Sequence, residues 1–472
     1  MTTPFDGIII GTGQAGPHLA QRLTAAGQRI AVVERKLFGG TCVNTGCTPT
    51  KSMVASARAA HVAGRAAEFG VRIPGEVGVD MRRVKERKDA IVAASRIGLQ
   101  KWLEGMENCT VYEGHASFES ARVVCVGGER LTADQVFINV GGRALVPTMP
   151  GLAQVQYFTN SSLMEVDFVP PRLIVVGGSY VGLEFGQMFR RFGSDVSIIE
   201  MGPRLVQRED EDVSVAIQDV LHGEGIELRL QAECIGFDRR GAEIVARLDC
   251  ADGPKEVSGT HVLLAVGRRP NTHDLGLDAA GVELDGRGYV VVDDECRTSV
   301  PGIWALGDCN GRGAFTHTSF NDAEIVAANV LDNDPRRLSD RIPAYALYTD
   351  PPLGRAGLTE TEVRKSGRRG LVGKRPMTQV SRAVEKGETQ GFMKIVVDED
   401  TSEILGAAIL GVGGDEAVHC ILDVMYAKVP YTSLQRAVHI HPTVSELIPT
   451  MLGALQPVQR ESNAEIGVFD MA

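Results

Sequence analysis

The chain has 472 residues, 23% of them charged, and acidic side chains outnumber basic ones to give a formal net charge of −11. This length predicts about three domains or more, and the negative charge argues against nucleic acid or an anionic membrane as a partner. No apolar run of about 18 residues occurs, and the N-terminus lacks a basic region followed by an apolar one, so we expect a cytoplasmic protein outside the membrane.

The first predicted elements form a dinucleotide-binding unit. An apolar strand at 7–10 runs into a G-x-G-x-x-G pattern, a helix-like stretch at 18–25 follows, and a second strand at 30–33 ends in Glu34. The glycines of the pattern are Gly11, Gly13 and Gly16. They permit a tight turn and close approach of a pyrophosphate at the helix N-terminus, while the acid binds ribose hydroxyls. A glycine pattern alone is weak evidence, but the complete unit predicts a dinucleotide site.

Two cysteines, Cys42 and Cys47, follow this unit at a spacing of five positions. Five residues of regular helix advance roughly 7.5 Å, more than the roughly 4.4–6.8 Å between the Cα atoms of a disulfide. A bridged pair therefore requires a kink where a helix begins, and Asn44 and Gly46 suit irregular backbone. The helix dipole would favour a thiolate there. Two unrelated thiols or half a zinc site are the alternatives, but the adjacent dinucleotide unit favours a redox pair.

A helical excursion is expected from about residue 51 to 105, and a second dinucleotide unit after it. A strand at 173–176 leads into the second glycine pattern, and the next strand, at 196–199, ends in Glu200. This pattern consists of Gly177, Ser179 and Gly182. Glu200 follows the first glycine at the spacing found in the first unit, which predicts two copies of one βαβ architecture and hence two dinucleotides. Serine replaces the middle glycine but is small.

Further short segments match a known pattern. They are 140–143 before Pro150-Gly151, 266–271, 303–308 and 441–446. With the two glycine patterns and the cysteine pair, they make nearly the whole chain resemble the class I pyridine nucleotide–disulfide oxidoreductases, a family that includes dihydrolipoamide dehydrogenase, glutathione reductase and mercuric reductase. The resemblance implies an α/β fold with two Rossmann-like domains, for FAD and for NAD(P), and a C-terminal α+β dimerisation domain.

The motifs place the expected domain boundaries. The expected domains are a FAD-binding domain at 1–150, a NAD(P)-binding domain at 151–274, a central segment at 275–341 that completes the FAD side, and an interface domain at 342–472. The last stretch, 458–472, is polar and mixed and is expected to be a loosely ordered tail.

The resemblance also implies a path for electrons, from NAD(P)H to FAD to a Cys42–Cys47 disulfide and on to a small disulfide or dithiol substrate. Cys47 matches the cysteine that lies against the flavin, and Cys42 matches the one that exchanges with substrate. Lys51 matches a lysine near the reactive nitrogen of the flavin, and Glu184 matches its ion-pair partner, which a buried ammonium needs. A solvated lysine at a helix start is the alternative for Lys51.

His441 matches the family's acid–base histidine. A histidine near neutral pKa can exchange a proton with a substrate thiol. Pro442 suits the first turn of a helix, which would bring Glu446 close enough to orient the imidazole. In the family this histidine comes from the other subunit, so the resemblance implies a homodimer with a shared active site. The neighbouring His439 is assigned no role.

The remaining site residues are expected to bind cofactors. Asp308 matches the aspartate that holds the ribityl chain of FAD, and Tyr180 matches an aromatic gate over the nicotinamide, with simple packing as an equal alternative. The others are Gly40, Thr41, Lys51, Gly142 and Gly267. Glu200 predicts a preference for NADH over NADPH because an acid repels a 2′-phosphate, although Arg204 lies close enough in sequence to weaken it. No metal site is predicted.

The substrate is the least determined feature. Mercuric reductases carry a cysteine pair near the C-terminus, whereas this chain has no cysteine after Cys420 and keeps the His-Pro-Thr segment that they usually lack. The sequence therefore favours a reductase or dehydrogenase of a small disulfide or dithiol, like dihydrolipoamide dehydrogenase. A metal-ion or quinone reductase is the alternative within the family. Flavin monooxygenases and non-catalytic flavoproteins form another class, but they need neither the cysteine pair nor His441.

Overall fold

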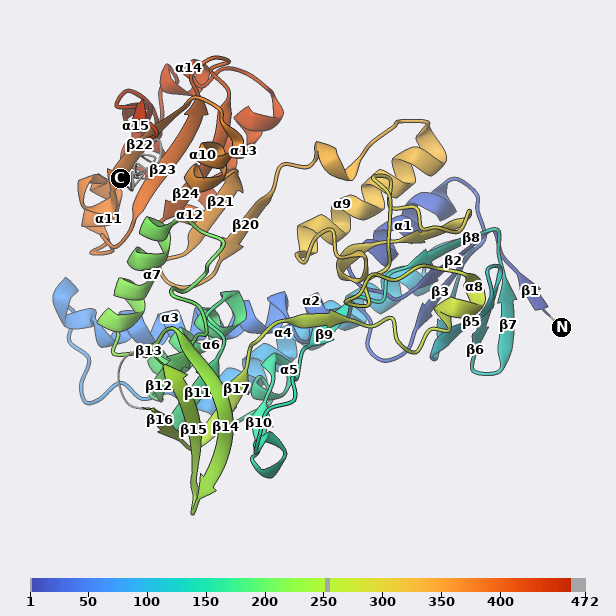
Figure 1. The fold of residues 1–472 in the computed structure, drawn as a ribbon, viewed down its shortest axis with the longest axis horizontal. Coiled ribbons are helices and arrows are strands. Elements are labelled where there is room, and N and C mark those ends of the chain that lie inside the picture. Colours follow the sequence, from blue (N-terminus) through green and yellow to red (C-terminus); the bar gives the residue numbers. More distant parts are fainter. Residues whose placement is uncertain (1, 251–254, 460–472) are drawn as a thin grey trace, which may run out of the picture. The chain divides into compact units, whose positions relative to one another are not determined.

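The computed structural model describes residues 2–250 and 255–459 (Figure 1). The chain divides into two compact units, the first made of 1–203 and 221–341 and the second of 204–220 and 342–472. The boundaries expected at 150, 274 and 341 stay predictions, and the sequence did not indicate that 204–220 belongs with the C-terminal part. The tail predicted over 458–472 lies outside the described residues from 460 onward.

A five-stranded parallel sheet lies at the centre of the N-terminal part, with the strand order β19-β8-β2-β3-β4. Its strands are β2 (Gly7–Ile10), β3 (Ile30–Glu34), β4 (Cys109–Glu113), β8 (Gln135–Ile138) and β19 (Ile303–Ala305). All four residues of β2 are buried, as expected for a parallel strand that is covered on both faces. Helix α1 (Ala15–Ala25) connects β2 to β3. The first predicted βαβ unit is confirmed.

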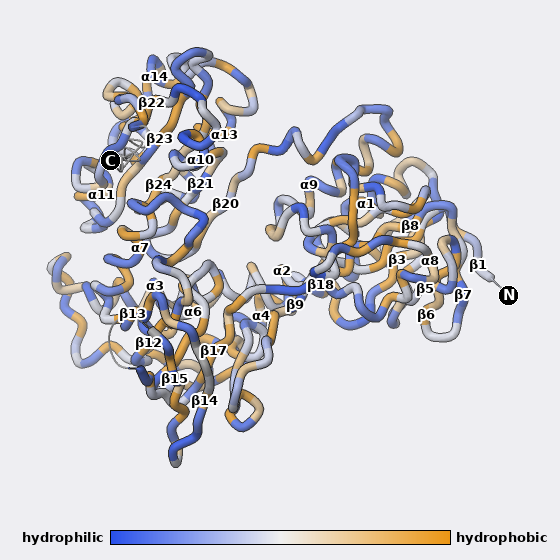
Figure 2. The backbone as a smooth tube through the Cα atoms, in the orientation of Figure 1, coloured by the Kyte–Doolittle hydropathy of each residue, from blue (hydrophilic) through white to orange (hydrophobic). Residues whose placement is uncertain are grey.

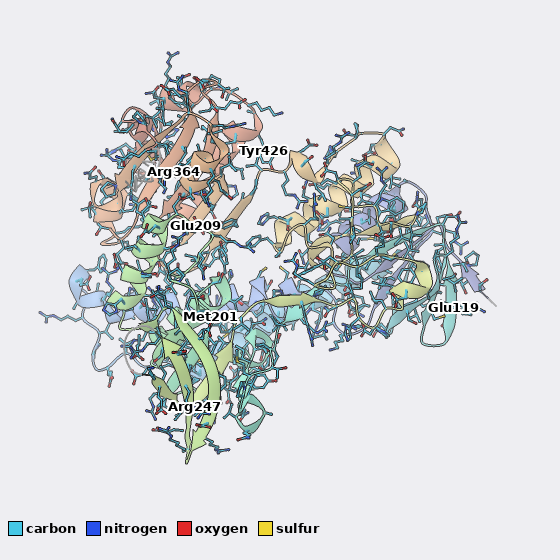
Figure 3. All side chains as sticks on the ribbon, viewed as in Figure 1. Glu119, Met201, Glu209, Arg247, Arg364 and Tyr426 are labelled. Carbon is cyan, nitrogen blue, oxygen red and sulfur yellow. The ribbon has the colours of Figure 1, made fainter. Side chains whose placement is uncertain are left out.

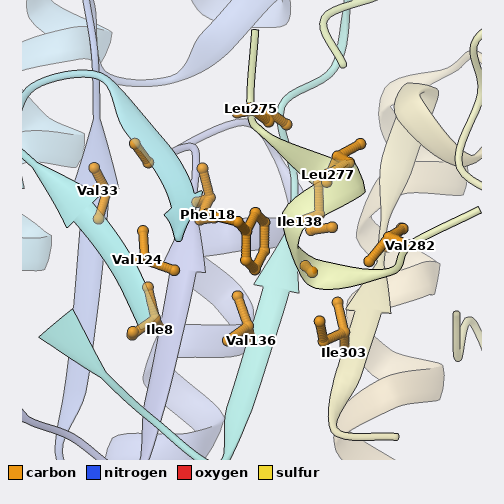
Figure 4. Packing of buried hydrophobic residues seen from close by; sticks show 14 of the residues in the cluster. Ile8, Val33, Phe118, Val124, Val136, Ile138, Leu275, Leu277, Val282 and Ile303 are labelled. Carbon is orange, nitrogen blue, oxygen red and sulfur yellow. The ribbon is translucent and has the colours of Figure 1, made fainter. Parts of the chain in front are cut away.

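A smaller sheet packs against the first one through a shared hydrophobic core. Its strands, in the order β1-β7-β6-β5, are β1 (Thr2–Pro4), β7 (Glu129–Thr132), β6 (Val123–Val126) and β5 (Ala116–Ser120). Figure 4 shows how Phe118 and Val124 from this sheet meet Ile8 and Ile138 from the parallel sheet. The segment that follows residue 274 joins the same core. It contributes Leu275, Leu277, Val282 and Ile303, with Leu277 in helix α8 (Leu277–Ala280).

The helical excursion is also confirmed. It consists of α2 (Gly40–Asn44), α3 (Cys47–Gly64), the 3₁₀ turn η1 (Ala66–Phe69) and α4 (Met81–Glu104). Asp80 caps α4, because its carboxylate accepts a hydrogen bond from the backbone N–H of Arg83 at 3.1 Å. No helix in the described ranges is both long and apolar enough to cross a membrane.

The second predicted βαβ unit is confirmed as well. Strands β10 (Tyr157–Phe158), β17 (His261–Leu264), β11 (Arg172–Val176), β12 (Asp195–Ile199) and β13 (Glu227–Arg229) form, in that order, a parallel sheet. Helix α6 (Tyr180–Phe192) connects β11 to β12 and buries one face. Hydrophobic stretches follow the strands of both parallel sheets in Figure 2. An antiparallel sheet of β14 (Ala232–Arg240), β15 (Glu243–Cys250) and β16 (Glu256–Gly259) completes this region.

Shorter elements link these sheets. Strand β9 (Gly142–Ala144) pairs with β18 (Arg268–Pro270) in an antiparallel ribbon. Helices α5 (Asn160–Leu163) and α9 (Thr316–Ala327) lie in the first unit, whereas most of α7 (Glu211–Gly223) belongs to the second. The ribbon and the N-terminus of α9 both contribute to the site described below.

The second unit is built on an antiparallel sheet with the order β20-β21-β24-β23-β22-β25. Its strands are β20 (Ala344–Leu347), β21 (Leu353–Gly357), β22 (Gly370–Pro376), β23 (Phe392–Asp398), β24 (Ile404–Leu410) and β25 (Gln456–Pro457). Its helices are α10 (Glu360–Ser366), α11 (Ser381–Glu385), α12 (Gly414–Ala417), α13 (His419–Tyr426), α14 (Thr432–Gln435) and α15 (Ile448–Leu452). Every residue of β23 and β24 is buried, so these strands form the core of the predicted α+β domain.

The segment 204–220 is attached to this sheet by buried charges. Glu209, labelled in Figure 3, accepts a hydrogen bond from the hydroxyl of Tyr345 at 2.6 Å and lies 3.9 Å from Nε of Arg355. Asp210 accepts hydrogen bonds from the first turn of α10 and contacts Lys394 on β23. These contacts explain why a segment between β12 and β13 groups with the C-terminal sheet.

Candidate active site

The first glycine pattern forms a close-fitting cradle at the N-terminus of α1. Gly11 has a φ of 105°, and a Cβ there would overlap the carbonyl of Asn139. A Cβ on Gly16 would overlap the carbonyl of Gly11. The side-chain amide of Asn139 donates to the carbonyls of Gly11 and Gly13, at 3.2 Å and 3.1 Å, and so fixes the turn. Sequence reasoning missed Asn139, which has no motif of its own.

Glu34 lies beside this cradle. Its carboxylate accepts hydrogen bonds from the backbone N–H and the hydroxyl of Thr12, at 3.1 Å and 2.6 Å, and from the N–H of Lys36 at 2.9 Å. The acid is therefore held at the end of β3, as a ribose-binding carboxylate requires.

The second cradle repeats the first. Gly177 has a φ of 115°, and a Cβ on Gly182 would overlap the carbonyl of Gly177. Glu200 accepts hydrogen bonds from the N–H groups of Gly178 and Gly202 at 2.7 Å and 2.8 Å. At the middle position of the first cradle, a Cβ on Gly13 would make only ordinary contacts, the nearest at 3.5 Å. A side chain at this middle position therefore meets no clash with the protein, which is consistent with Ser179 in the second cradle.

The two cysteines lie on either side of the predicted kink. Helix α2 carries Cys42 and ends at Asn44, while Cys47 is the first residue of α3. Gly46 between them is the N-cap, with φ −136° and ψ −117°, and a Cβ there would lie 2.8 Å from the carbonyl of Thr41. The expectation of irregular backbone and of a sulfur at a helix N-terminus is confirmed. Both cysteines are free thiols in this structure.

The two thiols have very different affinities for a proton. The hydrogen bond from Cys42 lowers the pKa of Cys47 to about 6. Loss of solvation opposes this shift, while the hydroxyl of Thr316 and the charge of Lys51 add to it. The same hydrogen bond, together with burial, raises the pKa of Cys42. A single proton in the reduced pair therefore resides on Cys42, and Cys47 is the thiolate.

Thr316 is a neighbour of this pair that the sequence motifs did not indicate. Its Oγ1 lies 3.0 Å from Sγ of Cys47, although 269 positions separate the two residues. Thr316 is the first residue of α9. The only local signal is its place at a helix start downstream of the Asp308 motif, which says nothing about a sulfur.

Lys51 and Glu184 are brought together by the packing of α3 on α6. Their Nζ and Oε2 atoms are 2.7 Å apart, and the Glu184 side chain is only 7% exposed. Tyr180, at the start of α6, packs edge-to-face on Phe315, with ring centroids 6.0 Å apart. Asn160 at the start of α5 donates its amide Nδ2 hydrogen to the carbonyl of Thr45 at 2.7 Å, inside the loop that joins the cysteines. Sequence reasoning missed this contact too.

Several expected cofactor residues gather around Arg268. Its guanidinium donates to the carbonyl of Gly142 at 2.6 Å and to the hydroxyl of Thr41 at 3.4 Å, and its Nε lies 3.7 Å from Asp308. Burial raises the pKa of Asp308 although the charge of Arg268 opposes it. A Cβ added to Gly40, next to Thr41, would lie 2.9 Å from Cα of Gly13 in the first cradle. Gly267 has a φ of 119° where the chain enters β18.

His441 and Glu446 lie in the second unit. Nδ1 of His441 is 2.8 Å from Oε2 of Glu446, and the His441 side chain is 73% exposed. The prediction that Pro442 begins a helix is wrong. The 3₁₀ turn η7 spans Ser445–Leu447, and α15 follows with Pro449 in its first turn. The preference of proline for the first turn of a helix applies equally to Pro442 and Pro449, and it is Pro449 that occupies the first turn of α15.

No group of three or more His, Cys, Asp or Glu side chains in the described part of the chain is arranged to hold a metal ion.

Comparison with known proteins identifies the family. Residues 5–323 match the pyridine nucleotide-disulphide oxidoreductase family, and residues 343–452 match the dimerisation domain of that family. The chain belongs to the pyridine nucleotide–disulfide oxidoreductases. The predicted fold class and enzyme class are therefore confirmed. Membership implies a flavin and a pyridine nucleotide as cofactors, and the dimerisation domain supports a homodimer.

Curated relatives with different names are about equally similar to the chain. A probable pyridine nucleotide-disulfide oxidoreductase of Escherichia coli, RclA, is 32% identical over 451 residues, which cover 94% of this chain and 97% of RclA. The mercuric reductase of Streptomyces lividans is 32% identical, with 94% and 95% covered. The dihydrolipoyl dehydrogenase of Thermus scotoductus is 31% identical, also with 94% and 95% covered.

Solved structures of RclA agree closely with this fold. The E. coli protein, described as an HOCl-induced flavoprotein disulfide reductase, gives a TM-score of 0.86 at 32% identity, with 95% of this chain and 99% of that chain covered. Its Cu(II) complex gives 0.87 at 31% identity, with 96% and 99% covered.

Proposed function

We propose that this protein is an NAD(P)H-dependent disulfide oxidoreductase in which Cys42 and Cys47 carry the electron pair to a small disulfide, or from a small dithiol. The single observation that carries the proposal is the placement of the two cysteines on either side of the kink at Gly46, with Cys47 as the first residue of α3. Cys47 has a pKa of about 6 at a helix N-terminus, while the pKa of Cys42 is raised by the same hydrogen bond. Such a pair is suited to thiol–disulfide exchange, because Cys42 brings the proton for the first leaving thiol and Cys47 is already the thiolate that closes the disulfide in the second step.

The residues present fit the implied cofactors. The first cradle, Glu34 and the group around Arg268 would hold FAD, and the second cradle with Glu200 would hold the pyridine nucleotide. At the first and last glycines of each cradle a Cβ would overlap neighbouring carbonyls, so they permit the tight turns that let a pyrophosphate approach a helix N-terminus. When bound, the flavin supplies two-electron transfer between the nicotinamide and a sulfur. Glu184 keeps the ammonium of Lys51 in place beside the cysteine pair.

The cysteines and a histidine then perform the exchange. The sulfur of Cys42, as it gives up its proton, attacks one sulfur of the substrate disulfide, which forms a mixed disulfide and releases one thiol. The thiolate of Cys47 attacks the sulfur of Cys42, which restores the intramolecular disulfide and releases the second substrate sulfur as a thiolate that takes its proton from solvent. His441 from a second copy of the chain accepts and returns the proton, and Glu446 orients its imidazole. The active site would thus be shared within the homodimer.

The relay is tested with cysteine variants. Cys42→Ser and Cys47→Ser should each abolish reduction of disulfides while FAD stays bound, because the cradle lies elsewhere in the sequence. Cys125→Ser, a half-buried thiol on β6, is the matched control and should keep full activity. Wild-type disulfide turnover by either active-site variant would refute the relay.

A second candidate function is reduction of a metal ion. It is favoured by the Cu(II) complex of RclA and by the similarity to a mercuric reductase. Because the described residues contain no separate metal cluster, an ion would be a substrate that meets the cysteine pair. One panel of lipoamide, glutathione disulfide, Cu(II), Hg(II) and quinones under identical conditions separates these functions. A preference for NADH and a cytoplasmic location stay predictions.

A further inference from the structure

Thr316 lies close enough to the reactive sulfur to act on it. Its Oγ1 is 3.0 Å from Sγ of Cys47. Because a thiolate can only accept a hydrogen bond, the hydroxyl must donate whenever Cys47 is ionised. We propose that Thr316 is a catalytic residue whose hydroxyl stabilises the Cys47 thiolate and thereby raises the reduction potential of the cysteine pair. The inference rests on the proposed function, since it requires Cys42 and Cys47 to cycle between disulfide and dithiol.

The start of α9 holds this hydroxyl in a fixed position. The backbone N–H of Phe315 donates to the hydroxyl of Thr318 at 3.2 Å, and that hydroxyl donates to the carbonyl of Phe315 at 2.8 Å. The N–H of Ser319 donates to the same carbonyl at 3.0 Å. The backbone on both sides of Thr316 is therefore tied down, so its side chain reaches Cys47 with little loss of conformational freedom.

Thr316 and Lys51 act on the sulfur in different ways. Lys51 acts through its charge, which Glu184 partly compensates at 2.7 Å. Thr316 is neutral and acts through its hydroxyl, which lies 3.0 Å from Sγ of Cys47 and also lowers the pKa of Cys42. After the hydrogen bond from Cys42, which has the largest effect, the hydroxyl of Thr316 lowers the pKa of Cys47 more than the charge of Lys51 does. Charge-assisted hydrogen bonds are stronger than neutral ones, so the contact gains strength when the thiolate forms.

Reduction of the pair creates the charge that this hydroxyl meets. When a hydride equivalent from the pyridine nucleotide, two electrons and one proton, reduces the disulfide, the bond between the sulfurs breaks, Cys42 takes up the proton and the negative charge resides on Cys47. The sulfur of Cys47 carries no charge in the disulfide and accepts only weakly. The hydrogen bond of Thr316 therefore stabilises the reduced form selectively, and its loss makes the disulfide harder to reduce.

The matched variants are Thr316→Val, which keeps the shape and removes the hydroxyl, and Thr316→Ser, which keeps the hydroxyl. The holoenzymes are equilibrated with dithiothreitol buffers at pH 8, where Cys47 is ionised, and the potential of the pair is measured. We expect an effect at the low end for a charged hydrogen bond, because the donor is a single neutral hydroxyl. Thr316→Val should shift the equilibrium about tenfold toward the disulfide, or about 30 mV more negative. Thr316→Ser should match the wild type.

The pH dependence separates this role from a packing effect. A tenfold loss of thiolate stability should slow iodoacetamide alkylation of Cys47 about fivefold at pH 6 in Thr316→Val, as followed by mass spectrometry. The difference in potential between Thr316→Val and wild type should disappear near pH 5, where both thiols are neutral. Thr48→Val, one residue after Cys47 in α3, is the control and should change neither quantity.

The outcomes separate the role of Thr316 from the proposed function of the cysteine pair. If the wild-type pair shows no reducible disulfide, the proposed function fails and the role of Thr316 fails with it. A normal wild-type pair with an unchanged potential and alkylation profile in Thr316→Val overturns the role of Thr316 alone. Equal shifts in Thr316→Val and Thr316→Ser would assign the effect to the methyl group and overturn it as well.

Discussion

The ammonium nitrogen of Lys394 lies 2.8 Å from Oδ2 of Asp210, and both side chains are buried, with exposed fractions of 2% and 6%. Lys394 also contacts Asp212 at 2.8 Å and Glu360 at 3.4 Å. Asp210 accepts hydrogen bonds from the N–H groups of Glu360 and Thr361 at the start of α10. One buried lysine thus joins the segment 204–220 to β23 and α10 within the second unit.

Removal of the lysine charge should be costly. Lys394→Met leaves the carboxylate of Asp210 buried and unpaired, a change that typically costs about 3–5 kcal/mol. Thermal unfolding followed by circular dichroism should show a large fall in Tm. The matched control is Lys374→Met, whose side chain is 46% exposed and pairs with the same Asp212 at 2.8 Å. It should cost about 1 kcal/mol or less. Equal losses in the two variants would contradict a special role for Lys394.

The same cluster predicts how stability depends on acid. Burial alone would raise the pKa of Asp210, but the bonds from Lys394 and Thr361 prevail and lower it to about 2. Because this folded-state pKa lies below the unfolded value of about 3.9, Asp210 adds about 2.5 kcal/mol of stability above pH 4, which is lost as the pH falls toward 2. In Asp210→Asn, Tm should fall less steeply over this interval. Parallel Tm profiles of variant and wild type would refute the assignment.

Asn160 is expected to restrain the loop between the cysteines. Asn160→Ala removes the hydrogen bond to the carbonyl of Thr45, which is worth about 1 kcal/mol. Hydrogen–deuterium exchange should therefore be faster in peptides that cover residues 40–50, since local opening becomes easier. Asn329→Ala, which removes a comparable pair of bonds to Ile325 and Arg336, is the control and should leave these peptides unchanged. Unchanged exchange in Asn160→Ala would show that the loop is held by other contacts.

The sequence predicted the features that depend on local spacing. Each βαβ unit was recognisable because its glycines, helix and terminal acid lie within one short stretch, and the kink at Gly46 followed from the reach of a disulfide. A packed α+β domain after residue 342 was expected from the resemblance to a family. These expectations needed no knowledge of distant contacts.

The features that were missed depend on contacts between distant segments. Thr316 meets Cys47 only because α9 begins beside α3, and Asn160 reaches Thr45 across 115 positions. The segment 204–220 is acidic and becomes helical at Glu211, and nothing in its composition shows that it pairs with a buried lysine on β23. A helix-start proline was assigned to Pro442 because the local rule cannot choose between neighbouring prolines.

Glu200 should decide between the two pyridine nucleotides. Its carboxylate is fixed by the N–H groups of Gly178 and Gly202, and Arg204 is engaged elsewhere, with the carbonyls of Gln207 and Glu209. Repulsion between this carboxylate and the 2′-phosphate of NADPH should give NADH about a tenfold higher kcat/KM than NADPH.

Substitution of this acid tests the preference directly. Glu200→Gln should bring the two kcat/KM values close together. Asp195→Ala, at the exposed opposite end of β12, is the control and should keep the preference. A clear preference for NADPH in the wild type would show that the acid does not select the nucleotide.

His441 should act on the cysteines of the other subunit. Its imidazole is exposed and oriented by Glu446, while Val438 and Ile440 nearby are 99% and 79% exposed, as expected of a surface that a second copy covers. His441→Gln should slow thiol–disulfide exchange by roughly 10²–10⁴-fold and leave reduction of the flavin by NADH nearly unchanged. Stopped-flow measurements of the two half-reactions separate these effects.

Mixed dimers test whether the site is shared. As homodimers, Cys42→Ser should be inactive in exchange and His441→Gln strongly slowed, but a heterodimer would contain one site with both Cys42 and His441 intact. Mixing these two variants should restore part of the activity. Mixing Cys42→Ser with Cys47→Ser is the control and should restore none. The two cysteines of a pair belong to one chain, so every site in that heterodimer lacks one of them. If exchange of subunits is demonstrated and no activity returns in the first mixture, His441 acts within its own chain or has no part in the exchange.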